Sequence, residues 1–405
     1  MSNQIPATPI FNPNRVILPI LCICSFSNLF NMRAISPVLV DISQDFGISV
    51  AVAGSLGAAY SLPAAFLAVI FGPLSDRYGR RTLMLFGLSF LTLASLGATL
   101  APSFVVLLAC RVLAGLGAAA LSPSVFAAVG DYFPYSERGR AFGWVVSGTT
   151  MAVVVGLPLG SLLAGYLSWR WMFGLLAGVF LIVILLVIRF LPASEESHKS
   201  KERGLAHYKS SFGLILRNRS TMIALLSSSM FGIFWQGWAT YTGAFFIQTF
   251  DISTEALAPI FTLQGLAILI ASRFGGVLAD RFTKKSLAAL AMLSGGVFMI
   301  LLTNIYGTLG LGIALNTMMA IPASMRFVAG NALISELVPK ARGTMVSMNT
   351  SANEIGTMTG SAIGGLTIAA SGGYGILGMS FGLAVILGAF LLQFFVVEGG
   401  EETAA

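Results

Sequence analysis

Residues 72–81 read GPLSDRYGRR, and residues 276–285 read GVLADRFTKK. Each stretch follows a long apolar run, and their aspartates, Asp76 and Asp280, stand 204 positions apart. The same offset separates Arg138 from Arg342, Gly156 from Gly360, and Gly160 from Gly364. A repeat at one fixed offset indicates a duplicated structural unit. Membrane proteins built from such repeats place their ligand site between the two halves.

The composition predicts a membrane protein. The 405 residues are 56% hydrophobic and only 10% charged, which is too apolar for a water-soluble chain of this size. Twelve apolar runs are each about 20 residues or longer, the length that crosses the hydrocarbon core as a helix. We expect them near residues 16–38, 50–72, 82–101, 104–127, 141–165, 171–192, 220–248, 256–279, 286–304, 307–332, 345–370 and 374–397.

These runs predict an all-α integral membrane fold of twelve transmembrane helices in two pseudo-symmetric six-helix bundles. The bundles are expected at residues 1–193 and 220–405, with a cytoplasmic linker at 194–219 between them. The second part of the linker, from 204 to 220, mixes apolar and basic residues. It fits either an amphipathic helix on the membrane surface or a solvated connection.

The positive residues predict the orientation. With both termini in the cytoplasm, 18 of the 23 Lys and Arg fall in the N-terminal tail and the cytoplasmic loops. The positive-inside rule describes this distribution, so we expect a multi-pass protein of the plasma or inner membrane with both termini cytoplasmic. The net charge of +7 is explained by these loops. We therefore expect the lipid bilayer, and no nucleic acid, as a partner.

Cofactors and catalytic chemistry have little support in the sequence. The cysteines lie in apolar runs, and His198 and His207 lie in the linker without a second ligand at metal spacing. No glycine-rich phosphate loop and no Ser/His/Asp set is present. We expect no metal, no cofactor and no enzyme activity.

Three motifs resemble those of one known family. The stretch 72–81 is similar to the signature between helices 2 and 3 of the major facilitator superfamily, and residues 111–119, RVLAGLGAA, resemble its helix 4 motif. Residues 156–160, GLPLG, are similar to its helix 5 antiporter motif, although Leu157 separates the usual Gly-Pro pair. The resemblance covers nearly the whole chain. It is strongest to the twelve-helix drug and metabolite exporters of the drug:H+ antiporter type, which implies a small-molecule substrate, H+ as coupling ion and a monomer.

The resemblance also implies a cytoplasmic gate. In it, Asp76 binds a helix N-terminus of the opposite half and an arginine of the next loop, Arg138 or Arg140. The implied gate residues are Asp76, Arg77, Arg80, Asp131, Arg138, Arg140, Asp280, Arg281, Glu336 and Arg342. One carboxylate at a helix N-terminus gains roughly 0.3–1 kcal/mol, so several contacts hold a conformation without freezing it. Alternatively, these charges only enforce topology.

Small residues and helix breakers predict close helix packing. Glycines let helices approach each other in the membrane, and a proline kinks its helix. The residues concerned are Gly72, Gly115, Gly156, Pro158, Gly160, Gly276, Gly360 and Gly364.

Polar side chains inside the spans are candidates for a central cavity. Arg111 lies within a span, where a guanidinium is costly unless it meets water or an acceptor. Arg33 lies five residues from the expected end of the first span, so it either snorkels outward or joins Asn28 at the cavity. If Arg33 and Arg111 both face the cavity, it is cationic and favours an anionic or zwitterionic substrate.

Glu354 is the carboxylate that the sequence places deepest in a span. It is either a proton carrier or the partner of Arg326 in a structural ion pair. The expected seventh helix adds an aromatic stripe in which Trp235, Trp238 and Tyr241 either pack or contact substrate.

The leading interpretation is therefore a secondary active transporter that exports a small organic molecule, a drug or metabolite, by proton-coupled alternating access. The alternative is import or exchange of a small organic anion through a cationic cavity. An integral-membrane enzyme or a sensor has no motif to support it.

Overall fold

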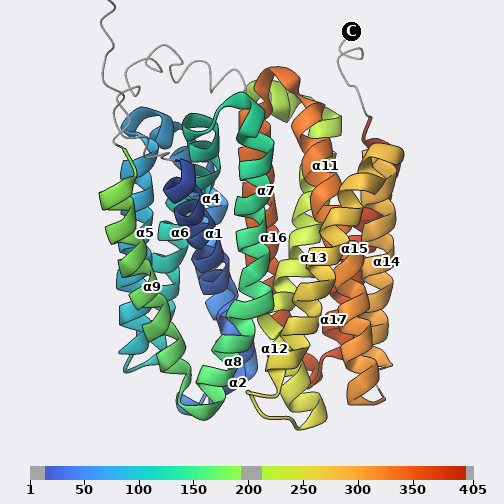
Figure 1. The fold of residues 1–405 in the computed structure, drawn as a ribbon. Helices are drawn as coiled ribbons and strands as arrows, with labels where there is room; N and C mark the ends of the chain where they lie inside the picture. The colour runs from blue at the N-terminus through green and yellow to red at the C-terminus, as the bar shows by residue number, and fades with distance from the viewer. Residues whose placement is uncertain (1–13, 193–211, 306, 398–405) are drawn as a thin grey trace, which may run out of the picture.

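The computed structural model describes residues 14–192, 212–305 and 307–397, and it is built of helices (Figure 1). The first half contains α1 (Asn14–Arg33), α2 (Ile35–Asp45), α3 (Val50–Ala53), α4 (Ser55–Tyr78), α5 (Arg80–Thr99), α6 (Phe104–Tyr132), α7 (Tyr135–Met151), the π-helix η1 (Ala152–Gly156), α8 (Leu157–Tyr166) and α9 (Trp169–Phe190). The second half contains α11 (Arg219–Gly232), the π-helix η3 (Ile233–Gly237), α12 (Trp238–Phe250), α13 (Leu257–Arg281), α14 (Lys284–Asn304), α15 (Leu309–Leu337), the 3-10 helix η4 (Pro339–Ala341), α16 (Arg342–Ser371) and α17 (Gly375–Phe395).

Small polar residues and glycine set several helix ends. Ser103 begins α6 and Thr308 begins α15, and each side chain accepts a hydrogen bond from the backbone N–H three residues later. This satisfies one of the N–H groups that every helix start leaves without a partner. Between α4 and α5 the chain turns at Gly79, whose φ of 87° is accessible to glycine at little cost.

Twelve elements cross the membrane. Ten helical stretches among the described residues are long and apolar enough to do so. Two others, α11–η3–α12 and α16, are equally long but more polar, and they carry Gln236 and Glu354. Together they form two pseudo-symmetric bundles of six, which confirms the predicted fold class.

The boundary predicted for the first span is wrong. The sequence predicts its end at residue 38, but the structure continues the span from α1 through α2 to Asp45. Arg33 therefore lies twelve residues from that end, about 18 Å at 1.5 Å per residue. No arginine side chain covers that distance, so Arg33 does not reach the end of this helical stretch. The amphipathic helix predicted at 204–220 begins outside the described residues.

The helices of each half pack mainly on one another, and three sets of contacts join the halves. Helix α4 packs on α16, α2 packs on α12, and α13 packs on η1 and α8. In Figure 1 the labels of α2, α8 and α12 converge at the bottom of the molecule. These contacts form the boundary between the two bundles.

The two ends of this boundary differ. We call the end where α4, α6, α13 and α15 finish the basic end, and the other the opposite end. Toward the opposite end, a Cβ added to Gly265 of α13 would lie 2.8 Å from the backbone nitrogen of Val154 in η1. There Thr254 also donates a hydrogen bond of 3.0 Å to Asp41 Oδ2. Near the basic end, a Cβ added to Gly276 has no atom within 4 Å. The halves are therefore tightly packed at the opposite end and less so around Gly276.

Most of the small residues predicted for close packing lie in tight contacts. An added Cβ would lie 3.0 Å from the Phe30 ring at Gly156, 2.7 Å from Met172 at Gly160 and 2.8 Å from a backbone oxygen at Gly360. At Gly115 and Gly364 it would overlap Tyr60 and Tyr241. Pro158 is buried in the first turn of α8. Gly276 has open space around it, and Gly72 lies outside the residues whose side chains are described.

Candidate functional site

The first and seventh spans are both irregular at one level. Helix α1 ends at Arg33 and the span resumes at Ile35 as α2, while η3 interrupts the seventh span and ends at Gly237. Gly237 lies 204 positions after Arg33, so the two irregular segments are equivalent in the internal repeat. Broken helices and π segments leave backbone groups and side chains available inside a membrane protein, and they are frequent at functional sites.

Arg111 of α6 stabilises the broken end of α1. Its guanidinium donates hydrogen bonds to the carbonyl oxygens of Asn31, at 3.1 Å, and Met32, at 3.3 Å. The last turn of a helix has carbonyl groups without intrahelical partners. Arg111 donates to that of Met32 and shares that of Asn31 with the Ala34 N–H, which lies 3.4 Å away. Its guanidinium carbon also lies 4.5 Å from the ring centroid of Tyr60. Arg111 is 1% exposed and acts here as a packing and hydrogen-bonding group.

Arg33 connects the two halves. Its Nη2 donates a hydrogen bond to Oε1 of Gln236 in η3. Its guanidinium carbon lies 5.2 Å from the ring centroid of Trp235, a distance at which a cation is attracted to the ring face. The Arg33 side chain is buried, and its Nε has no hydrogen-bond partner among the described residues.

A cavity lies at this level between the bundles. It is lined by Met32, Arg33, Ile35, Ser36, Gly57, Tyr60, Ser61, Gln236, Ala239, Thr240 and Thr357. The lining comes from both halves and contains one cationic side chain and no carboxylate. The cavity therefore places Arg33, which the sequence predicts as a candidate, at the boundary between the two halves.

Glu354 of α16 lies beside this cavity. Its carboxyl group faces the hydroxyl of Ser61 on α4. Neither Glu354 Oε2 nor Ser61 Oγ has a hydrogen-bond partner in good geometry among the described residues. Thr357, which lines the cavity, is three residues from Glu354 on the same helix. The carboxyl group therefore lies at the boundary of the halves, next to the cavity.

Arg326 does not pair with Glu354. Among the described residues, the Arg326 guanidinium contacts Ser228 Oγ and Met292 Sδ, both at 3.2 Å, and its carbon lies 4.9 Å from the ring centroid of Phe231. All these contacts are within the second half. The ion pair that the sequence left open is absent from this conformation.

The aromatic stripe of the seventh span separates into two parts. Trp235 contacts Arg33 near the cavity. Trp238 and Tyr241 are fully buried: Trp238 packs on Phe245, and the Tyr241 hydroxyl donates a hydrogen bond to a backbone oxygen of α16. In this conformation these two side chains are part of the packing. Asn28 is half-buried, and its Oδ1 has no partner among the described residues.

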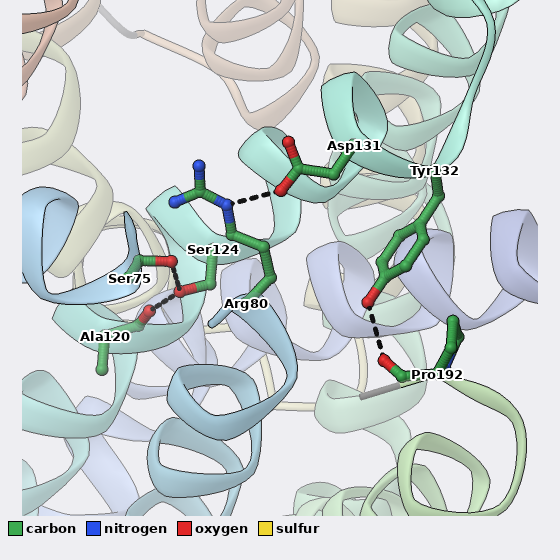
Figure 2. A network of polar contacts seen from close by, with 7 residues as sticks. All are labelled: Ser75, Arg80, Ala120, Ser124, Asp131, Tyr132 and Pro192. Atoms are coloured by element: carbon green, nitrogen blue, oxygen red, sulfur yellow. Dashed lines mark hydrogen bonds and ion pairs between the residues drawn. The ribbon is translucent and has the colours of Figure 1, made fainter. Parts of the chain in front are cut away.

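Two equivalent ion pairs lie at the basic end. Arg80 at the start of α5 donates to Asp131 at the end of α6 at 2.8 Å (Figure 2). Lys284 at the start of α14 pairs with Glu336 at the end of α15 at 2.5 Å. Arg80 and Lys284 are 204 positions apart, so the repeat places one cation on each half. Both carboxylate side chains are about half exposed, at 47% and 56%, and each pair ties helices within one half.

Nearby hydroxyl groups add to the first of these clusters. Figure 2 shows a contact between the hydroxyl groups of Ser75 on α4 and Ser124 on α6. Their oxygens are 3.1 Å apart, and Ser124 donates to the carbonyl of Ala120. The Tyr132 hydroxyl donates to the carbonyl of Pro192 at 3.1 Å. These contacts fasten the ends of α4, α6 and α9 together.

The remaining gate residues stay predictions. The side chains of Asp76 and Asp280 lie outside the described part of the structure. Arg138 donates to the carbonyl of Phe133 in its own loop, and Arg342 donates to Ser335. Arg77, Arg140 and Arg281 are exposed.

The opposite end carries its own polar contacts. Asp45 of α2 accepts hydrogen bonds from Arg170 and from the indole N–H of Trp169, at the start of α9. In the loop before α13, a backbone N–H and the Ser253 hydroxyl donate to Glu255, and they lower the pKa of its carboxyl group below its usual value. Among the described residues no group of three or more His, Cys, Asp or Glu could hold a metal ion.

Comparison with known proteins identifies the family. The sequence profile of the Major Facilitator Superfamily matches residues 21–263 and 246–404. The chain belongs to this superfamily. The two matches together cover residues 21–404 and overlap at 246–263. Members of the Major Facilitator Superfamily are transporters rather than enzymes. The chain is therefore a multi-pass membrane transporter of small molecules.

Alignments with similar proteins cover most of this superfamily member. It is 25% identical to the uncharacterized MFS-type transporter YceJ of Bacillus subtilis (strain 168), over 92% of this chain and 94% of the relative. It is 27% identical to the chloramphenicol resistance protein of Streptomyces lividans, over 81% and 83%. It is 24% identical to multidrug resistance protein 2 of Bacillus subtilis (strain 168), over 93% and 95%.

A solved structure shares the fold of this transporter. The crystal structure of a D-xylose–proton symporter matches it with a TM-score of 0.80, covering 95% of this chain and 98% of that one. The sequence identity is 18%, so this likeness establishes the arrangement of helices and nothing about the substrate.

Sequence reasoning missed part of the site. Gln236, Ser36 and Ser61 line the cavity, yet none carries a charge or belongs to a motif. The repeat offset was the available signal for Gln236, because it places η3 opposite the end of α1. No local signal distinguishes Ser36 and Ser61 from the many other serines in the spans.

Proposed function

We propose that this transporter exports a small organic molecule in exchange for protons, by alternating access, as a single chain in the plasma or inner membrane. Relatives named for chloramphenicol and multidrug resistance support export. Residues 1–193 and 220–405 move as two bodies joined by the linker 194–219. The basic end, which the positive-inside rule assigns to the cytoplasm with both termini, opens in turn with the opposite end.

The position of Glu354 is the observation that carries the coupling proposal. Its carboxyl group lies between the halves, and Oε2 has no hydrogen-bond partner among the described residues. When the boundary opens to one side at a time, such a group takes a proton from one side and releases it to the other. Arg326 holds contacts of its own within the second half, so it leaves the carboxyl group free to titrate.

The ion pairs at the basic end support a gate there. Arg80–Asp131 and Lys284–Glu336 hold the loop regions of each half in equivalent geometry. In the closed state we expect the Asp76 and Asp280 loops to reach the opposite half, with Arg138 and Arg342 as cationic partners. Packing of α4 on α16 at Glu354 would change with this closure.

Proton-driven transport in liposomes tests the proposal. Purified protein is reconstituted, a pH gradient is imposed, and proton flux is measured on addition of the lipophilic cation tetraphenylphosphonium or of benzoate. The Glu354→Gln variant should lose gradient-driven transport, because an amide group does not take up and release a proton as a carboxyl group does. Glu137→Gln, at an exposed carboxylate of α7, is the matched control and should transport normally. Unchanged transport by Glu354→Gln excludes the coupling role.

The alternative function is import or exchange of a small organic anion. Arg33 favours it, because it is the one charged residue in the cavity lining. The same liposome assay separates the two functions through the direction of benzoate movement: accumulation with protons indicates import, and expulsion against proton entry indicates export.

A further inference from the structure

Three hydrogen-bonding atoms at the cavity have no partner among the described residues. They are Nε of Arg33, Oγ of Ser36 and Oγ of Ser61. All three side chains are at least nine-tenths buried, with exposures of 8%, 2% and 0%, and all three residues line the same cavity. A buried donor without a partner costs roughly 1–3 kcal/mol, so three at one place call for a functional explanation.

Other buried serines in this transporter satisfy their hydroxyl groups locally. Ser161 donates to the carbonyl four residues earlier in its own helix, and Ser124 does the same. Ser43 donates to a carbonyl three residues earlier. Serine in a membrane helix normally makes this bond. Ser36 and Ser61 differ from these three serines, and they differ from Ser351, whose hydroxyl also has no partner among the described residues, in that both line the cavity.

The charge of the lining restricts what can bind. The lining has one guanidinium and no carboxylate, and the nearest acidic group, Glu354, stands behind Ser61. The Nη2 of Arg33 already donates to Gln236, which leaves the Nε–H to a ligand. One N–H and two O–H groups on residues that line one cavity match a group with two or more acceptor oxygens and a negative charge.

We propose that this cavity binds the carboxylate of the transported molecule, with Arg33, Ser36 and Ser61 as the residues that recognise it. The proposal deepens the proposed transport function and rests on it for its physiological meaning. Arg33 and both serines belong to the first half, whereas Gln236 belongs to the second and contacts Arg33 directly. A carboxylate that competes with Gln236 for the guanidinium weakens this bond between the halves. Substrate binding is thereby linked to their separation.

The test compares ligands that differ only in charge. The purified full chain in detergent is titrated with formate, acetate and benzoate, and with formamide, acetamide and benzamide, and binding is followed by calorimetry and thermal shift. The acids should bind and the amides should bind at least tenfold more weakly, since charge-assisted hydrogen bonds are about twice as strong as neutral ones. Equal binding of acids and amides, or no binding of any acid, overturns the proposal. This comparison needs no variant.

Variants then identify the residues. Ser36→Ala and Ser61→Ala should each weaken acetate binding by roughly ten- to a hundredfold, the range for a hydrogen bond to a charged group. The melting temperature of Ser36→Ala should stay near wild type, because the Ser36 hydroxyl has no partner among the described residues to lose. Ser61→Ala also removes the hydroxyl that faces the Glu354 carboxyl group, so its acetate binding is compared at equal folded fraction. Ser161→Ala is the matched control and should leave acetate binding unchanged. Serine variants that bind acetate like the wild type contradict the assignment.

Glu354→Gln distinguishes this proposal from the transport proposal. Removal of a negative charge beside Ser61 should tighten acetate binding, whereas proton-driven transport should be lost. If the variant binds acetate more tightly but still transports with the gradient, the coupling role is wrong and the carboxylate site stands. If it binds acetate less tightly, the carboxylate site is wrong.

Discussion

Replacement of Gly265 by alanine should separate the two halves at the opposite end and favour the conformation that is open there. The added Cβ would lie 2.8 Å from both the backbone nitrogen and a side-chain methyl of Val154, and ordinary contacts begin at 3.4 Å. Because the nearest atoms include backbone of η1, a change of rotamer cannot relieve the overlap. Helices α13 and η1 must separate by more than half an ångström.

The magnitude follows from the cost of overpacking. An extra methyl group in a well-packed contact costs roughly 1–3 kcal/mol. Alanine also favours the helix over glycine by up to about 1 kcal/mol, but Gly265 is helical whichever end is open, so this gain cancels. A bias of 1–3 kcal/mol changes the ratio of the two conformations by about 5- to 150-fold. The ratio of the conformation open at the opposite end to the conformation closed there should increase by that factor.

Distance measurements between spin labels check this prediction. Cys22, Cys24 and Cys110 are first replaced by alanine, and labels are attached at Leu167 and Ile305, which are 64% and 60% exposed at the opposite end of different halves. Gly265→Ala should shift the distance distribution to longer values. Gly276→Ala, on the same helix with no atom within 4 Å, should not. A distribution that Gly265→Ala leaves unchanged refutes the reasoning, as does an equal lengthening by Gly276→Ala.

Two further predictions concern stability. Arg111→Leu should destabilise the protein by about 2–4 kcal/mol, because the carbonyl groups at the end of α1 lose their side-chain donor. Arg111→Lys should recover only part of this stability, since one ammonium group cannot reproduce the planar guanidinium. Thermal unfolding in detergent measures both variants, and full recovery by lysine contradicts this role of Arg111. Arg170→Ala should cost no more than about 1 kcal/mol, because its ion pair with Asp45 is partly exposed, and a loss of folded protein in the same assay would show that α2 and α9 depend on this pair.

The helices could largely be predicted because their signals are local. Each span is visible in the sequence as an apolar run. Gly79 lies between two helices, and Ser103 and Thr308 precede the first residues of α6 and α15. The first span is the exception. The end of its second part, α2, contains Asp41 and Asp45, and these two charges led the sequence prediction to end the span too early. Those charges are tolerated because Thr254 and Arg170 contact them.

The site was only partly predictable because it depends on partners far apart in the chain. Arg33, Arg111 and Arg326 look alike in sequence, as buried arginines without a neighbouring carboxylate. In the folded protein, Arg111 holds the end of α1, Arg326 packs within the second half, and Arg33 lines the cavity. Gln236 and Ser61, which are uncharged and outside any motif, complete the surroundings of Arg33 and Glu354.

The sequence by itself determined the solvent, the number of spans, the internal repeat and the family, because hydrophobicity and periodicity act over short segments whose effects add along the chain. The tertiary structure alone decided which buried polar groups find partners and which stay unpaired at the cavity. That outcome depends on the packing of α4 on α16 and of α2 on α12. Contacts between residues some 200 to 300 positions apart leave no mark on either residue's own sequence neighbourhood.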